Sequence, residues 1–480
     1  MGSIKEDTAR GVKWSLVERV AVQGIQFVLG FILARLLSPS DYGVVGMMAI
    51  FIAISENIVD SGFSKALIRK LDRTETDFST AFYFNIVVGL VCYGILFFAS
   101  PAIASFFNTP VLEDLAKVMA LCLFVNSLSV VQVARLTIAV DFKSQAKASA
   151  SAALVSGFVG VGMAYVGWGV WALAWQSVAK SVINTVVIWV VARWRPRAHF
   201  SWQSFRNLFG YGSKLLAASI INTIHGQLTT LAIGKFYTPA DLGNYTRGQQ
   251  FATLPNYQIV SVLQRVTFPI LARLQNDRPA LIGAYRKYIR TSSLAIMFLT
   301  LILVALARPV VMLLLTEKWV GAVPYLQVFA FAIMFDHVNQ INMNLLQISG
   351  RTDVYLRTEV IKKVISFLML VAAIPFGVMA ICVSRVAYCQ VAVAINTNVT
   401  GRYYGLGYRE QLSDILPYLI MSALCCAPAF ALSELCDIWI LDIAVGGLVA
   451  VILLALTLHV RRDSVYVEFI EPYVKKIFRK

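Results

Sequence analysis

The chain has 480 residues, of which 58% are hydrophobic and only 14% are charged. Soluble proteins carry roughly 25% charged residues, so a chain of this length with so little polar surface is not a set of soluble domains. The composition predicts an integral membrane protein. The net charge of +16 is then no sign of a nucleic-acid partner, because membrane proteins collect Lys and Arg on one side.

Apolar stretches of about 20 residues, the length that crosses a bilayer, recur along the whole chain. They predict about fourteen transmembrane helices, over residues 12–37, 43–62, 79–99, 116–140, 148–166, 168–192, 212–234, 243–271, 291–308, 323–349, 359–374, 378–400, 413–432 and 439–459. The stretches are long and lack period-two alternation, which disfavours a closed barrel of strands. The expected fold is an all-α polytopic membrane protein with no room for a soluble catalytic domain.

The distribution of basic residues predicts the orientation. With the N-terminus inside, 31 of the 42 Lys and Arg residues fall in inner segments, nine lie in spans, and the outer loops hold only Lys235 and Lys318. An even number of spans with both termini cytoplasmic is therefore expected.

The chain repeats two short motifs at similar offsets. The motif SPSDYG at Ser38–Gly43 recurs as TPADLG at Thr238–Gly243, and GVWA at Gly169–Ala172 recurs as GVMA at Gly377–Ala380. Six spans separate the copies, so the two halves share one orientation, which predicts two pseudo-symmetric six-helix lobes plus two C-terminal helices. We expect lobes at 1–192 and 215–400, a cytoplasmic linker at 193–214, and two extra helices with a basic tail at 401–480.

Motifs for catalysis, metal binding or nucleotide binding are missing from the sequence. The four histidines show no HExxH spacing, no GxxxxGK[ST] loop occurs, and the seven cysteines form no CxxC. We therefore expect no catalytic residues, no metal and no cofactor, and a driving force that comes from a gradient or a partner.

Polar side chains within the spans must face protein or water rather than lipid. On three spans they share one helical face, and these candidate substrate-binding residues are Arg19, Gln23, Gln26, Arg247, Gln250, Gln258, Arg265, Asp336, Gln340 and Asn344. One interpretation is helix–helix contact, where amides bond across the interface. The other is a water-filled cavity between the two bundles, which is favoured where an Arg shares the face.

Acidic residues are rarer in the spans. Glu56 and Asp60 share one face of the second span, and three roles remain open: pairing with a cavity Arg, capping the inner helix end, or coupling to protons or Na⁺. The amides Asn126 and Asn184 fit the helix-contact interpretation. Guanidinium groups bind phosphate through parallel hydrogen bonds, so Arg with amides predicts an anionic, hydroxyl-rich ligand.

Several segments together resemble one family of transporters. The residues that carry the resemblance are Ala34–Gly43, Ser61–Phe63, Ala66–Ile68, Leu242–Arg247, Leu254, Pro255, Phe268, Pro269, Leu271–Leu274, Pro309–Leu315, Lys318 and Trp319. They are similar to the O-antigen and exopolysaccharide (Wzx-like) flippases of the multidrug/oligosaccharidyl-lipid/polysaccharide superfamily, over most of residues 10–400.

The resemblance implies a two-lobe flippase that works by alternating access in the bacterial inner membrane. Its substrate would be a polyprenyl-pyrophosphate-linked oligosaccharide, and its partners would include membrane lipids, a polysaccharide polymerase and chain-length machinery. Three alternatives are a multidrug or cation antiporter, which needs acids and aromatics for cationic drugs, a polymerase or ligase, which needs a large outer loop, and a scaffold.

Overall fold

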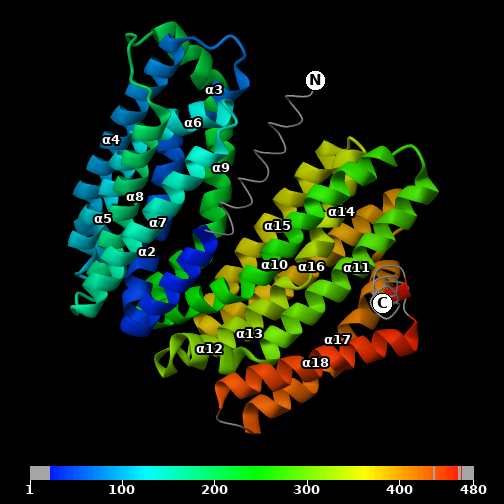
Figure 1. Cartoon of the computed structure of the whole chain (residues 1–480). Coiled ribbons are helices and arrows are strands. Elements are labelled where there is room, and N and C mark those ends of the chain that lie inside the picture. The colour runs from blue at the N-terminus through cyan, green and yellow to red at the C-terminus, as the bar shows by residue number, and fades with distance from the viewer. Residues whose placement is uncertain (1–21, 436–437, 463–465, 468–480) are drawn as a thin grey trace, which may run out of the picture. The chain divides into compact units, whose positions relative to one another are not determined.

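A computed structural model of the chain describes residues 22–435, 438–462 and 466–467 (Figure 1). Every regular element among these residues is a helix, which confirms the predicted all-α membrane fold. The chain forms two compact units, Met1–Gly243 and Asn244–Lys480. These units are defined by packing, and the predicted lobe boundaries stay a prediction.

The first unit contains the helix Val22–Leu36 and nine further helices or parts of helices. Their bounds are α2 Pro39–Asp60, α3 Phe63–Arg69, α4 Glu75–Phe107, α5 Leu112–Ser127, α6 Val130–Ile138, α7 Phe142–Tyr165, α8 Val170–Ala192, α9 Trp202–Phe236 and the start of α10 Pro239–Arg273. Within this unit α7 packs along α8, α4 along α5, and α2 along α9 (Figure 1).

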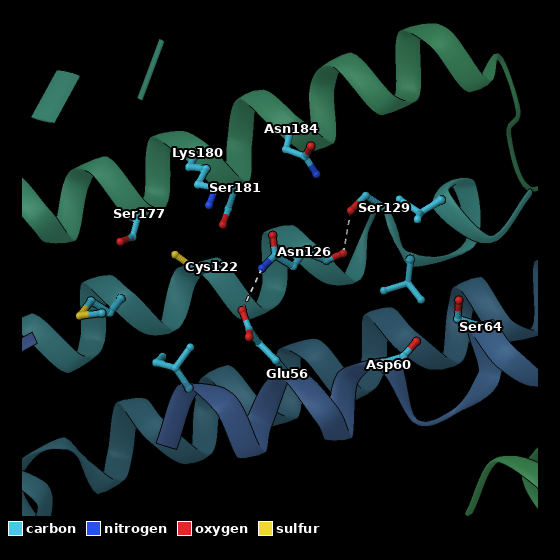
Figure 2. Close-up of a pocket in the computed structure, with 14 residues that line it drawn as sticks. Glu56, Asp60, Ser64, Cys122, Asn126, Ser129, Ser177, Lys180, Ser181 and Asn184 are labelled. Carbon is cyan, nitrogen blue, oxygen red and sulfur yellow. Dashed lines mark hydrogen bonds between the residues drawn. The ribbon is translucent and has the colours of Figure 1, made fainter. Parts of the chain in front are cut away.

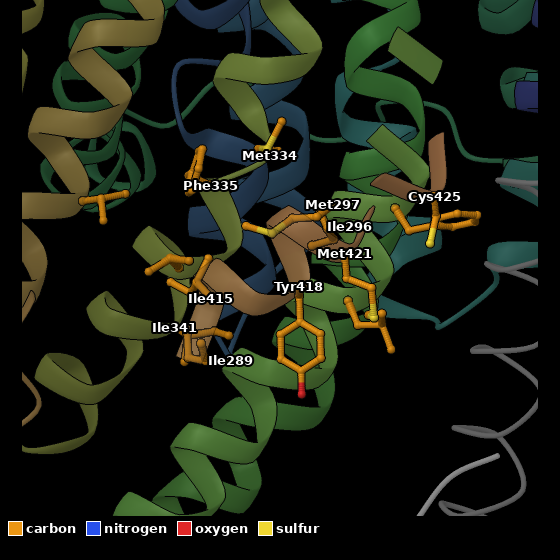
Figure 3. Packing of buried hydrophobic residues seen from close by; sticks show 14 of the residues in the cluster. Ile289, Ile296, Met297, Met334, Phe335, Ile341, Ile415, Tyr418, Met421 and Cys425 are labelled. Atoms are coloured by element: carbon orange, nitrogen blue, oxygen red, sulfur yellow. The ribbon is translucent and has the colours of Figure 1, made fainter. Parts of the chain in front are cut away.

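The second unit contains the rest of α10 and the remaining helices. Their bounds are α11 Arg278–Ala305, α12 Ala307–Leu315, η1 Glu317–Trp319, α13 Ala322–Ile333, α14 Asp336–Ile348, α15 Thr352–Ala373, η2 Ile374–Phe376, α16 Val378–Tyr404, α17 Tyr408–Leu435 and α18 Trp439–Arg461. The long helices α11 and α17 pack against each other around a buried apolar cluster that includes Ile289, Met297, Tyr418 and Met421 (Figure 3).

The described part of each predicted span is helical, although the bounds differ. The predicted span 116–140 is two helices, α5 and α6, bent by 41° at a short break, and the span 323–349 is likewise divided into α13 and α14. The predicted linker 193–214 is mostly helical, because α9 already begins at Trp202. Eight described helices are long and apolar enough to cross a membrane, or nine with the bent pair, so the count of fourteen stays a prediction.

Both copies of the first repeated motif begin a helix, and the local chemistry explains the motif. The Ser38 hydroxyl accepts from the Asp41 backbone N–H at 3.3 Å, while the Asp41 carboxylate accepts from the Ser38 backbone N–H at 2.9 Å. Thr238 and Asp241 make the same two bonds at 3.1 and 3.2 Å. This reciprocal arrangement satisfies two free N–H groups at a helix start. Proline fits the first turn because the N–H that it lacks would have no partner within the helix at that position.

The second repeat also begins helices, at α8 and α16. Gly169 and Gly377 precede the first residues of these helices with φ of 54° and 102°. A side chain is strained in this left-handed region and glycine is not. Both repeats therefore encode helix starts at corresponding places in the two halves of the chain.

The glycines of the first repeat allow the two helix starts to touch. A Cβ added to Gly43 would lie 1.7 Å from the Pro239 carbonyl oxygen, and a Cβ added to Gly243 would lie 1.8 Å from the Pro39 carbonyl oxygen. The contact is reciprocal, with the glycine of each motif against the proline of the other, and all four residues belong to the first unit.

Substituting Gly43 by alanine should therefore destabilise the protein by about 1–3 kcal/mol, because two backbones must separate to admit one methyl group. Thermal unfolding of the purified protein in detergent measures the effect. Gly94→Ala on α4 is the matched control, since a Cβ there has nothing within 4 Å. Equal melting temperatures for the two variants would contradict the packing argument.

A charged cluster joins α11 to α17 in the second unit. The Arg286 Nε donates to Asp414 Oδ2 at 2.7 Å, and a terminal nitrogen of Arg290 donates to Asp414 Oδ1 at 2.6 Å. The Asp414 side chain is only 3% exposed. A buried carboxylate with two guanidinium partners is stable only as long as both partners remain.

We expect Asp414→Asn to lower the free energy of unfolding by about 1.5–3 kcal/mol, the typical contribution of a hydrogen bond to a charged group. The conservative amide keeps the shape and removes the charge. Asp353→Asn, at an exposed position of α15, should leave the unfolding transition unchanged. A transition of Asp414→Asn that matches this control would show that the cluster contributes nothing to stability.

Candidate functional site

A cavity of about 550 Å³ lies inside the first unit (Figure 2). Its walls come from α2, α3, α5, α6 and α8, and polar side chains outnumber apolar ones. The lining residues are Ile52, Glu56, Asp60, Ser64, Met119, Cys122, Asn126, Ser129, Val130, Val133, Ser177, Lys180, Ser181 and Asn184.

One wall carries the acids. Glu56 and Asp60 are four residues apart on α2, so they share a helical face, and Ser64 on α3 continues the same line. The turn between the two helices makes this possible: Ser61 and Gly62 both adopt left-handed conformations, with φ of 49° and 67°. Both carboxylates face the cavity (Figure 2), which confirms that they share a face.

The opposite wall is a polar stripe on α8. Ser177, Lys180, Ser181 and Asn184 have the spacing i, i+3, i+4 and i+7, which places all four on one side of a helix. Figure 2 shows Lys180 and Glu56 entering the cavity from opposite helices. The positive charge of Lys180 attracts the carboxylate of Glu56 electrostatically.

The break between α5 and α6 supplies the third wall. Asn126 Nδ2 donates to Glu56 Oε1 at 3.5 Å, a long hydrogen bond, and Ser129 Oγ donates to the Asn126 carbonyl oxygen at 3.0 Å (Figure 2). Ser129 lies in the bend itself, where the helix ladder is interrupted. The bend therefore turns polar groups toward the two charged walls.

The exposure of the charged side chains indicates that the cavity admits water. Glu56 and Lys180 are both exposed, although they lie within apolar helices. A charge facing hydrocarbon at mid-bilayer costs at least about 2.5–3.5 kcal/mol, so such residues face protein or a polar cavity instead. The space between α2, α5 and α8 provides that polar surrounding.

The other predicted candidates are not among the residues that line this cavity. Arg19 lies outside the described residues, and Gln258 and Arg265 lie on α10 with side chains outside the described part. Gln23 and Gln26 are exposed on the helix Val22–Leu36. Their assignment to a substrate cavity stays a prediction.

In the second unit, Arg247 is engaged by its neighbours. It is only 8% exposed, donates to Gln250 Oε1 at 2.6 Å, and its guanidinium lies 5.7 Å from the centre of the Trp319 ring. These contacts hold the start of α10 against η1.

The predicted polar face on α14 is partly buried. Asn344 is buried, Asp336 and Gln340 are half-buried, and the neighbouring Asn339 accepts a 2.8 Å hydrogen bond from Asn396 Nδ2. The last contact is the helix–helix bonding that polar residues in membranes provide. Whether the rest of this face meets substrate stays a prediction.

Sequence reasoning did not single out Lys180 as a cavity residue. It interpreted Asn126 and Asn184 as helix contacts, and the bond from Asn126 to Glu56 does join two helices, but all three residues also line the cavity. The signal for α8 was present in the sequence, because its four polar residues repeat at helical spacing around a lysine.

We predict that Ser181→Cys reacts at least about tenfold faster with a water-soluble thiol reagent than Val186→Cys, because only a hydrated thiol ionises to the reactive thiolate. Both positions lie on α8, and Val186 is exposed on its apolar surface, outside the cavity lining. The native cysteines, including Cys122 in the cavity, are replaced first. Equal labelling rates in the purified protein would show that water does not enter the cavity.

The sequence of this chain is similar to those of known proteins. A family model described as "Polysaccharide biosynthesis protein" matches residues 32–324. The chain is 24% identical over 434 residues to the teichuronic acid biosynthesis protein TuaB of Bacillus subtilis strain 168, covering 88% of this chain and 89% of the relative. It is 25% identical over 432 residues to the lipopolysaccharide biosynthesis protein WzxC of Escherichia coli K12, covering 87% and 86%.

Among solved structures, the chain is similar to the lipid II flippase MurJ in its inward closed conformation. The TM-score is 0.71 at 12% identity, covering 93% of this chain and all of that chain. A multidrug resistance transporter of the MATE family in an inward-facing conformation has a TM-score of 0.58 at 13% identity, covering 83% and 99%. These structures share the fold, and the family model spans more than half of the sequence, so the chain belongs to the family of polysaccharide biosynthesis proteins.

Proposed function

We propose that the protein is a flippase for a polyprenyl-pyrophosphate-linked oligosaccharide, the repeat unit of an O-antigen, capsule or exopolysaccharide. It moves this lipid from the inner to the outer leaflet of the bacterial cytoplasmic membrane by alternating access. The chain acts as a transporter rather than an enzyme, and it would hand its product to a polysaccharide polymerase and chain-length machinery.

The observation that carries this proposal is membership of a polysaccharide biosynthesis family in a chain that has the fold of a lipid II flippase. Relatives are named for teichuronic acid, lipopolysaccharide and succinoglycan biosynthesis, the last of them as a transport protein, which supports a role in glycan export. The mixed-charge cavity in the first unit supports it further, because a glycan needs a polar path through hydrocarbon.

The orientation belongs to the same proposal. The surplus of Lys and Arg on alternate loops supports an orientation with both termini in the cytoplasm. The lipid-linked oligosaccharide is then loaded from the side on which the basic loops lie.

We further propose that different polar residues bind different parts of the substrate. Arg19, Arg265 and Arg247 would bind the pyrophosphate, since guanidinium groups pair with phosphate oxygens bidentately. The amides would hydrogen-bond the sugars, and these residues are Gln23, Gln26, Gln250, Gln258, Gln340 and Asn344, with Asp336 on the same face as the last two. The prenyl chain would stay in lipid.

The direct test is to deplete the protein in the producing bacterium and locate the lipid-linked oligosaccharide. We expect it to accumulate on the inner leaflet, protected from a glycosidase added to the periplasmic side, and to become accessible after re-expression. Outer-leaflet exposure that is unchanged in a strain without a second flippase would contradict the proposal and would favour a multidrug antiporter of the same fold.

A second prediction concerns the cations. Arg265→Ala should reduce export at least about tenfold at normal protein levels, the effect of losing roughly 1.4 kcal/mol of binding to the anionic group. Arg273→Ala is the control, because Arg273 is exposed at the end of the same helix. Export at the wild-type rate in both Arg265→Ala and Arg19→Ala would show that the pyrophosphate site lies elsewhere.

A further inference from the structure

We propose that the cavity inside the first unit is a binding site for neutral or amino sugar residues of the substrate, with the carboxylates of Glu56 and Asp60 as its main hydroxyl acceptors. The inference rests on the proposed flippase function and adds a second sugar site, apart from the amides named above, together with the kind of sugar that this site selects.

The size of the cavity favours an organic ligand. Its volume of about 550 Å³ falls within the range of about 300–1,000 Å³ that is typical of small-molecule sites. A dehydrated cation needs oxygen ligands that converge at about 2–2.6 Å, whereas here the polar groups are spread over walls from five helices. The space is therefore suited to a ligand with many hydroxyl groups distributed over its surface.

The hydrogen-bonding groups of the cavity complement a sugar. Within the described part of the chain, no hydrogen bond or ion pair joins Asp60, Lys180 or Asn184 to another residue. Glu56 has only the long contact from Asn126 at 3.5 Å. A sugar hydroxyl both donates and accepts, so it can donate to a carboxylate and accept from the lysine or an amide.

Apolar side chains complete this complementarity. Ile52, Met119, Val130 and Val133 line the same cavity. A pyranose ring has apolar C–H faces between its hydroxyl groups, and ligand sites combine an apolar lining with a few polar groups that fix orientation. Together the two kinds of lining residue suit a carbohydrate better than an inorganic ion.

The charge of the cavity argues against the pyrophosphate as its occupant. Two carboxylates and one ammonium group line the space, so acidic groups outnumber basic ones. A pyrophosphate would be repelled by Glu56 and Asp60, whereas a neutral sugar avoids this repulsion and an amino sugar is attracted. The glycan and the pyrophosphate are therefore bound by different parts of the chain.

Binding of two lipids to the full-length protein in nanodiscs distinguishes recognition of the glycan from recognition of the pyrophosphate. One is the polyprenyl-diphosphate-linked repeat unit purified from the producing strain, and the other is polyprenyl diphosphate without sugar. The double variant Glu56→Gln/Asp60→Asn should raise the Kd for the glycosylated lipid about tenfold and leave the Kd for the sugarless lipid unchanged. Glu113→Gln/Asp114→Asn is the matched control, since these two acids lie on α5 outside the cavity and pair with Lys117.

Labelling of Ser181→Cys provides a second measurement that keeps both carboxylates. The glycosylated lipid should protect this cysteine from a thiol reagent, and the sugarless lipid should not. This result would support the site even if the double variant failed to fold.

Three results would overturn the sugar site: unchanged affinity of the double variant for the glycosylated lipid, an equal loss of affinity for both lipids, or no protection of Ser181→Cys. Loss of transport with unchanged binding would instead assign Glu56 and Asp60 to energy coupling. The leaflet assay on depleted cells tests the flippase proposal itself, because unchanged outer-leaflet exposure there would contradict it.

Discussion

Hydrocarbon offers no hydrogen bonds, and the structure of this chain depends on that fact. Every backbone N–H and C=O that enters the bilayer must find a partner inside the protein, which restricts spanning segments of this kind to helices. The described residues form helices throughout both units. The same constraint extends to side chains, because a charge within a span is tolerated only beside protein or water.

Charges within the helices are accommodated in two different ways. In the second unit, Asp414 is neutralised by Arg286 and Arg290, so that opposite charges join α11 to α17. In the first unit, Glu56 and Lys180 face a shared cavity and form no ion pair with each other. Paired charges join helices, whereas charges without an ion-pair partner around a polar space are available to a ligand, as the proposed sugar site requires.

The repeated motifs show how short sequences control helix packing. A serine or threonine cap, a proline and an aspartate begin α2 and α10, and the glycine that follows lets each helix start touch the proline of the other. The cap satisfies the backbone, and the missing side chain permits the contact. One motif thus encodes both where a helix begins and where it meets its repeat.

The sequence by itself determined the membrane fold, the helical segments, the internal repeats and the family resemblance, because all of these depend on local composition and spacing. It also placed Glu56 and Asp60 on one helical face. Only the tertiary structure decided that Lys180 and Asn184 of α8 face those acids, that residues 116–140 bend, and that Arg247 is held by Gln250 and Trp319. Helical periodicity specifies which residues share a face, but what that face meets depends on helices far apart in the chain.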